Sequence, residues 1–505
     1  MSAIIKESLK TSGVNYIGII LGALFTLYLT PKYFPTEVNG LYRLLLEYSA
    51  IAAVYFHFGM PSIINKYYHR VNYEGRVNKG FDFFVFVCPL VVISVFAIFL
   101  YFFKPHFVNL IGSDKDYQMI DNYIFFLVPL ILCNVYFFIF EGYSAMLGNI
   151  TVINFFKNIV LKIFNILSVI LYFYTRDFKF VMLLVTVGYL LSIICVYIYV
   201  LKLKKYIIDL RPSLAFLKEN GLLRDFVKFL LFLSLSNFSF FLLSKVDVFF
   251  VGKFTDLSNL AYYTTATYFV TLLLVPYSAV LNISFPKIAK TYVDGNIEEL
   301  RTLIANNSVY GLVLAAYIFV VIWSNLDTIY SLIPNGDLYK AGKFIFLILS
   351  VGKLVDISIG SLGQLITISK WYMLTLYSSI VISIISIFLG YFLTSKYGII
   401  GASSSISLCI CLSVAFQLFV AKYKIGVSPY SKKVLILILL VPFILVGCML
   451  IDLSISNMFV SSLVKVIVST ISYFYIICKF QISQDVSFII EKTCAVLRQK
   501  FGQLK

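Results

Sequence analysis

Long apolar runs separated by short polar stretches dominate the hydropathy pattern of this chain. Each run has about 17–25 residues, the length that an α-helix needs to cross a bilayer. Alternating ten-residue segments are absent from the sequence, and open sheet edges cannot face lipid, so the runs predict transmembrane helices. Fourteen spans are predicted, at 11–30, 41–60, 81–103, 119–140, 158–174, 180–200, 226–250, 260–283, 303–324, 341–363, 373–394, 398–420, 433–451 and 458–479.

An internal repeat divides most of these spans into two halves. The stretch FPTEVNGLYRL (34–44) aligns without a gap with FTDLSNLAYYT (254–264), six predicted spans later. Six is an even number, so both halves have the same orientation in the membrane, as in several transporter folds. The predicted fold is therefore an all-α integral membrane protein. Its parts are a six-helix lobe at 1–200, a second at 201–425, an extra helix pair at 426–480 and a cytoplasmic amphipathic tail at 481–505.

The positive charge of the chain follows this topology. The 505 residues are 60% hydrophobic and 13% charged, with a net charge of +17. With the N-terminus inside, most Lys and Arg residues fall in cytoplasmic segments, and an even number of spans returns the C-terminus to the cytoplasm. Topology therefore explains the basic excess, and no nucleic-acid partner is predicted. We expect the first apolar run to be a retained span, because it is too long for a signal peptide.

Four cations remain once the others are assigned to the inner and outer segments and span ends, and they are the candidate substrate-binding residues: Arg43, Lys245, Lys353 and Lys465. A charge at the bilayer centre costs at least about 2.5–3.5 kcal/mol, so each needs water or a partner. Lys353 is nearest the middle of a span. Arg43 and Lys245 lie toward the outer ends of theirs, where snorkelling to the headgroups is an alternative explanation. Lys465, in the extra pair, is either a binding, a structural or a lipid-adjacent residue.

Three acidic residues accompany these cations and are the candidates for ion pairing or ion coupling. Glu47 lies four residues after Arg43, and Asp356 lies three residues after Lys353, spacings that permit pairing on one helix. Asp247 follows Lys245 by only two residues, so these two side chains should point to different sides. A cationic cavity between the halves would suit an anionic substrate.

Two stretches carry a resemblance to a known family. They are IKESLKTSGVNYIGIILGALFTLYLTPKYFPTEVNGLYRLL (5–45) and SKVDVFFVGKFTDLSNLAYYTTATYFV (244–270). Both resemble lipid-linked oligosaccharide flippases of the polysaccharide-exporter branch, within the multidrug/oligosaccharidyl-lipid/polysaccharide exporter superfamily. The family has an acidic residue in span 7 and a tyrosine-containing start of span 8. Asp247, Tyr262 and Tyr263 occupy these positions.

The resemblance implies a function for the whole chain. Family members have two lobes around a central cationic cavity lined by spans 1, 2, 7 and 8. They move an undecaprenyl-pyrophosphate-linked oligosaccharide, such as an O-antigen unit, across the bacterial inner membrane by rocking of the lobes, coupled to an ion gradient. The implied partners are that lipid-linked oligosaccharide, membrane lipids, a proton or sodium ion, and other polysaccharide-assembly membrane proteins. This chain has fewer intramembrane arginines than the family pattern.

Two alternatives stay open at this stage. The first is another cargo on the same fold: a lipid-linked peptidoglycan precursor, a teichoic-type unit or a small drug. The second is a polymerase, ligase or glycosyltransferase of the same pathway, which would need a reaction site on a sizeable outer loop. The sequence lacks paired carboxylates and metal-ligand spacing, so no enzymatic activity, metal or cofactor is predicted. We interpret the lone Asp114-x-Asp116 as a solvated turn rather than a metal site.

Overall fold

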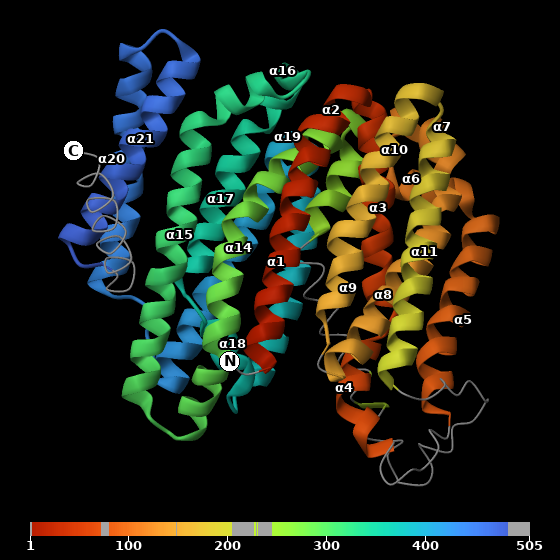
Figure 1. Cartoon of the computed structure of the whole chain (residues 1–505), viewed down its shortest axis with the longest axis horizontal. Coiled ribbons are helices and arrows are strands. Elements are labelled where there is room, and N and C mark those ends of the chain that lie inside the picture. Colours follow the sequence, from red (N-terminus) through yellow and green to blue (C-terminus); the bar gives the residue numbers. More distant parts are fainter. Residues whose placement is uncertain are drawn as a thin grey trace, which may run out of the picture. The chain divides into compact units, whose positions relative to one another are not determined.

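The structure, a computed structural model, describes residues 3–71, 80–147, 149–204, 227–228, 230 and 245–482 (Figure 1). Every regular element in these ranges is a helix, and they contain no β-strand, which confirms the all-α class. Among them, ten helices are long and apolar enough to cross a membrane, or eleven if one bent pair is a single span. The chain is therefore a multi-pass membrane protein. The predicted tail lies almost wholly outside the described residues.

Helices lie at the predicted spans. Span 226–250 is described only in part, and its helix is seen from 245 to 254. By packing, the chain forms two compact units. Unit 1 comprises Met1–Thr265, Ile333–Asn335 and Ser386–Ala402, and unit 2 comprises the remaining ranges. Their boundary falls inside α14 (Leu257–Val293). The two six-helix lobes expected from the repeat stay a prediction, because the repeat and the packing define different boundaries.

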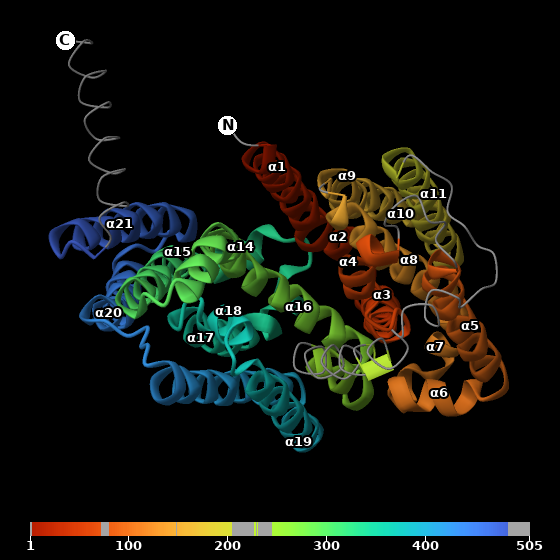
Figure 2. The same cartoon turned by 90° about the horizontal axis from the view of Figure 1, so that it is seen from below.

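Unit 1 is organised around α8 (Leu127–Met146), which packs against four neighbours, α3, α4, α5 and α11 (Figure 2). Its buried face is apolar, with Leu130, Val135 and Ile139 fully inaccessible. Burial of such side chains contributes roughly 1.5–3 kcal/mol each in water, whereas in lipid close packing has to supply the association. The other helices of unit 1 are α1 (Ala3–Ala23), η1 (Leu24–Leu29), α2 (Thr30–Tyr33), α3 (Thr36–Phe56), α4 (Met60–Val71), α5 (Phe81–Phe102), α6 (Lys104–Ile111), α7 (Tyr117–Tyr123), α9 (Thr151–Phe155), η5 (Phe156–Val160), α10 (Leu161–Thr175) and α11 (Phe178–Lys204).

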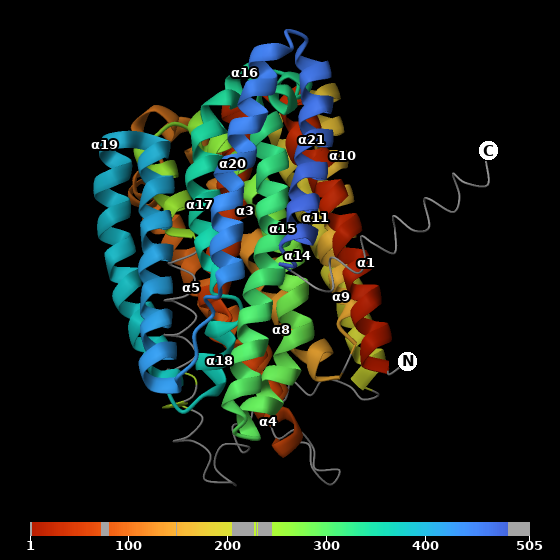
Figure 3. The same cartoon turned by 90° about the vertical axis from the view of Figure 1, so that its left-hand side faces the viewer.

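Unit 2 is organised around α15 (Ile297–Leu332), which packs against α17, α20 and α21 (Figure 3). The last two are the predicted extra pair, and they also pack against each other. A fully buried apolar cluster that includes Leu300, Ile304 and Leu362 fills one end of this unit. The helices are α17 (Lys343–Ser358), α18 (Leu362–Ile368), α20 (Lys432–Ser454) and α21 (Met458–Lys479), with the short α16 (Gly336–Tyr339) before α17.

A single glycine divides α19 (Tyr372–Val420) into two arms (Figure 3). A straight helix of 49 residues would be about 74 Å long, more than twice the hydrocarbon thickness of a bilayer. Gly398 has φ 57° and ψ −137°, which residues with a side chain rarely adopt. A Cβ at Gly401 would lie 1.9 Å from the Leu393 carbonyl oxygen, so the chain doubles back tightly here. The arms match the two separate spans predicted at 373–394 and 398–420.

Candidate functional site

A salt bridge inside unit 1 joins α3 to the helix at 245–254. The Lys245 ammonium donates to Glu47 Oε2 at 2.6 Å, and the two side chains are 35% and 28% exposed. A pocket of about 310 Å³ adjoins Lys245 and is otherwise lined by apolar and aromatic residues, among them Ile51, Tyr55 and Phe249. The partner of Glu47 thus comes from a helix 198 residues away in sequence.

Two aromatic residues, Tyr48 and Phe25, contact the elements that carry the charged residues of this site. Tyr48 follows Glu47 on α3, and its hydroxyl lies 3.2 Å from the carbonyl oxygens of Ile111 and Phe249. Its ring also stacks on Phe249, which fixes α3 against the helix that carries Lys245. Arg43 lies one turn before Glu47, and its guanidinium stands 5.2 Å from the centre of the Phe25 ring on η1. Cation–π contacts of this kind suit a guanidinium removed from water.

Asp247 is buried and has a different partner from Lys245. The Tyr263 hydroxyl, at the start of α14, donates a hydrogen bond to Asp247 Oδ2. Only 5% of Asp247 is exposed. The structure therefore agrees with the expectation that Lys245 and Asp247 point to different sides. Whether Asp247 couples transport to an ion stays a prediction, as does the coupling role of Glu47.

Sequence reasoning missed Lys162, which also belongs to this site. The prediction placed it at the cytoplasmic end of span 158–174, but α9, η5 and α10 form one continuous helix from Thr151 to Thr175. Lys162 therefore lies near the middle of the span, about 20 Å from Thr175. It interacts electrostatically with Glu47 and Arg43. The only sequence signal was the polar start of this helix, where Asn154 and Lys157 lower the hydropathy.

Unit 2 holds the other predicted pair on α17. The Lys353 ammonium lies 3.8 Å from Asp356 Oδ2, and both side chains are partly exposed. This contact confirms the predicted i,i+3 pairing. A loose and partly solvated pair of this kind contributes little to stability and leaves both groups available to other partners. The binding role of Lys353 and the coupling role of Asp356 stay predictions.

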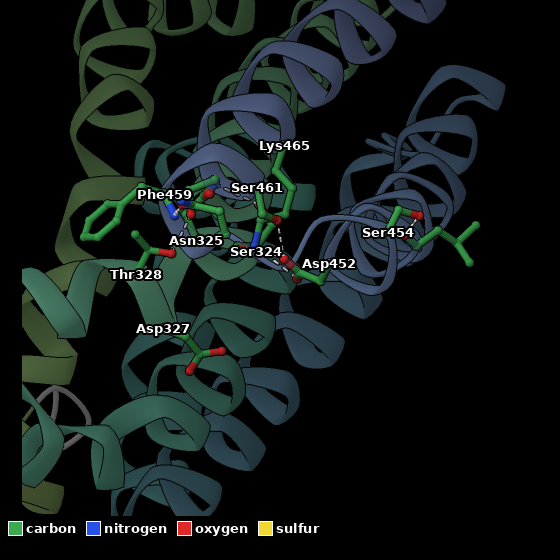
Figure 4. A network of polar contacts seen from close by, with 12 residues as sticks. Ser324, Asn325, Asp327, Thr328, Asp452, Ser454, Phe459, Ser461 and Lys465 are labelled. Atoms are coloured by element: carbon green, nitrogen blue, oxygen red, sulfur yellow. Dashed lines mark hydrogen bonds and ion pairs between the residues drawn. The ribbon is translucent and has the colours of Figure 1, made fainter.

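Lys465 lies in a polar network that ties α21 to α20 and α15 (Figure 4). Its ammonium is 2.8 Å from Asp452 Oδ1 and 2.6 Å from the Ser324 carbonyl oxygen. The Ser461 hydroxyl donates to the same carboxylate at 2.6 Å. Only 5% of Lys465 is exposed, whereas the Asp452 side chain is half exposed. These contacts give Lys465 a structural environment, and its predicted binding role stays untested.

A second group of contacts in unit 1 joins the starts of α3 and α14, the two aligned repeat segments. The Thr36 and Ser258 hydroxyls are 2.9 Å apart. A Cβ at Gly40 would lie 1.8 Å from the Leu257 carbonyl oxygen, so only glycine permits this approach. Asp116 Oδ2 accepts from the Leu257 amide at 2.9 Å and caps α14. The interpretation of Asp116 as a solvated turn residue was therefore wrong, because its carboxylate binds a helix N-terminus.

These features have counterparts among known proteins at the level of the fold. No family model and no curated protein sequence matches the chain. Among solved structures, one described as "Lipid II flippase MurJ, inward closed conformation" matches with a TM-score of 0.70 and 17% identity, covering 94% of this chain and 99% of that one. The chain has the fold of this transporter.

Two multidrug transporters have the same fold. An inward-facing multidrug resistance MATE family transporter of the MOP superfamily matches with a TM-score of 0.58 and 14% identity, over 84% of this chain and 95% of that one. The Vibrio cholerae MATE transporter VcmN in the bent form gives 0.54 and 13%, over 83% and 96%. At these identities the fold is shared and the cargo is not specified. The polysaccharide-exporter branch therefore stays a prediction.

Among the described residues, no group of three or more His, Cys, Asp or Glu side chains is placed to hold a metal ion. The structure brings Arg43, Glu47 and Lys245 together in unit 1, with Lys162 added. It places Lys353 with Asp356, and Lys465 with Asp452, as two separate pairs in unit 2. The arrangement in unit 1 suits recognition of an anion, since its cations outnumber its carboxylates and one of them, Lys245, lines a pocket.

Proposed function

We propose that this chain is a flippase that moves an undecaprenyl-pyrophosphate-linked oligosaccharide across the bacterial inner membrane by alternating access. The observation that carries the proposal is the fold, which extends over nearly the whole of a structure described as a lipid II flippase. A transporter of that description handles a lipid-linked cargo. The similarity covers 94% of this chain.

The charges inside the membrane favour a cargo with an anionic headgroup. Arg43 and Lys245 are the proposed phosphate contacts in unit 1, and Lys353 is a separate proposed contact in unit 2. Arginine grips phosphate oxygens in a fork, and lysine serves as a point charge. A cationic drug, by contrast, would be repelled by these residues. We give Lys465 a structural role in this proposal, because its ammonium already has two close acceptors.

Three carboxylates are available for coupling to a proton or sodium ion. Glu47 and Asp356 each neutralise a proposed phosphate-binding lysine, while Asp247 is hydrogen-bonded to Tyr263. A phosphate and a carboxylate compete for the same ammonium. Protonation of Glu47 would therefore release Lys245 to the cargo, which is a direct way to link an ion gradient to cargo binding.

A lipid-linked peptidoglycan precursor is the second candidate cargo. The match with the lipid II flippase favours it, since that structure is covered over 99% of its length. Its headgroup bears the same kind of charge on a lipid carrier, so the cluster at Glu47 does not discriminate between the two cargos.

Complementation in two hosts tests the proposal and separates the cargos. One host lacks its O-antigen flippase and the other is depleted of its lipid II flippase, with membrane levels of this protein matched by immunoblot. We expect surface glycan to be restored in the first host. Growth restored only in the second would assign the peptidoglycan precursor. Restoration in neither, with the protein present in the membrane, would refute the proposal. Arg43→Ala and Lys353→Ala should each reduce the restored transport, and full activity of both would remove the site assignment.

A further inference from the structure

Lys162 is an intramembrane cation that no carboxylate of the described residues contacts directly. It makes no hydrogen bond or ion pair with any residue that the structure describes, although it interacts electrostatically with Arg43 and Glu47. Its side chain is only partly accessible. The buried face of α10 contains Asn165, Val169 and Tyr172, at three, seven and ten residues after Lys162, so Lys162 is on the same face.

The balance of charge around Glu47 depends on this residue. Lys245 has Glu47 as its direct partner, and Asp247 interacts with Lys245 from the other side of the same helix. Arg43, Lys162 and Lys245 are three positive charges, and Glu47 and Asp247 are two negative ones. The cluster therefore has a net charge of +1, and removing Lys162 would make it neutral. A neutral cluster attracts an anion less strongly than a cluster with a net positive charge.

Snorkelling does not remove the cost of this charge. Lys162 is about 20 Å from the outer end of its helix and about 16 Å from the start at Thr151, near the middle of the span. A lysine side chain reaches only the interface near a helix end. An unpaired ammonium at this depth needs water or an anionic ligand.

We propose that Lys162 is a specificity-determining residue that selects cargo with a charged phosphate headgroup over uncharged lipid. This inference rests on the proposed function and adds the residue that supplies the positive excess of the site. Lys245 is paired with Glu47, whereas Lys162 has no hydrogen-bond or ion-pair partner among the described residues, so its ammonium is available to a phosphate. A phosphate oxygen then replaces the Glu47 carboxylate as the partner of the Lys245 ammonium.

The test compares binding of three lipids that differ only in the headgroup: undecaprenyl pyrophosphate, undecaprenyl phosphate and undecaprenol. Binding to the full-length purified protein is quantified by native mass spectrometry in detergent. The variants are Lys162→Met, Lys162→Gln and Lys162→Arg. The matched control is Lys157→Met on the same helix, because Lys157 is already paired with Glu141 at 3.1 Å. Thermal melting of each variant checks that it is folded.

We expect Lys162→Met and Lys162→Gln to weaken undecaprenyl pyrophosphate binding about tenfold or more, the loss of one charge-assisted contact. Binding of undecaprenol should stay unchanged, Lys162→Arg should retain the preference, and Lys157→Met should behave as the original protein. Unchanged affinity for the pyrophosphate in both neutral variants would overturn the role of Lys162. If the protein without substitutions bound all three lipids equally, this result would instead contradict the proposed function.

Discussion

Gly40 permits the closest approach between α3 and α14, and replacing it with alanine should separate the two helix starts. The Cβ of alanine would lie 1.8 Å from the Leu257 carbonyl oxygen and 2.8 Å from the Leu257 Cα. Carbon–oxygen contacts normally stop near 3.3 Å, so the helices would have to move apart by about 1.5 Å. The Thr36–Ser258 hydrogen bond at the same place could not survive that movement.

The steric cost sets the size of the change. Alanine in place of glycine favours a helix interior by about 1 kcal/mol whether or not the two helix starts touch, so this effect cancels. Forcing an added carbon into a filled contact costs typically 1–3 kcal/mol, and here the contacting atoms belong to the backbone and cannot rotate away. We expect Gly40→Ala to destabilise the arrangement in which the starts of α3 and α14 touch by on the order of 1.4 kcal/mol, relative to the arrangement in which they are apart. This corresponds to a tenfold change in the ratio of the two populations.

Disulfide trapping measures this population. The eight native cysteines are replaced, and cysteines are introduced at Thr36 and Ser258, whose hydroxyl oxygens are 2.9 Å apart. We expect Gly40→Ala to slow disulfide formation about tenfold. The control is Gly447→Ala in α20, where an added Cβ meets nothing within 4 Å. Equal trapping rates in Gly40→Ala and Gly447→Ala would refute the steric argument.

Three further predictions follow from single contacts. Lys465→Met should destabilise the α20–α21 pair by about 1–3 kcal/mol, because Asp452 and the Ser324 carbonyl lose the buried ammonium that they contact. Thermal melting in detergent checks this, with Lys340→Met as the exposed control. Asp116→Ala should remove a helix cap worth about 1 kcal/mol and slow the same disulfide trapping, whereas Asp116→Asn should retain it. Gly398→Ala should strain the backbone by about 1–3 kcal/mol and lower the yield of folded protein measured by size-exclusion chromatography.

The spans were predictable because the signal that defines them is local. A run of about 20 apolar residues has no other stable use in lipid, so hydropathy located the helices wherever the structure describes them. The bend at Gly398 was predicted correctly as a gap between two spans. The start of the helix at Thr151 was not, because Asn154 and Lys157 interrupt the apolar run. That error placed Lys162 at the cytoplasmic end of its span instead of near the middle.

The partners of the charged residues were less predictable. Pairing within one helix follows from spacing, and Lys353 with Asp356 obeyed it. Pairing between helices depends on packing that a single sequence does not encode locally. Glu47 had Arg43 as its nearest candidate in sequence, yet its carboxylate contacts Lys245 on another helix. The role of Asp116 escaped for the same reason, since its partner is a backbone amide 141 residues away.

The reversal at Gly398 has a practical consequence for mapping the topology of this protein. Almost no chain is left outside the helical arms at that point, and the exposed residues of the turn are Ser395, Lys396 and Tyr397. A labelling experiment without a reporter among these residues would count one crossing where there are two, and it would assign every later segment to the wrong face. Further reporter sites lie in the longer connection at 104–117, where helix α6 and the turn after it provide accessible positions.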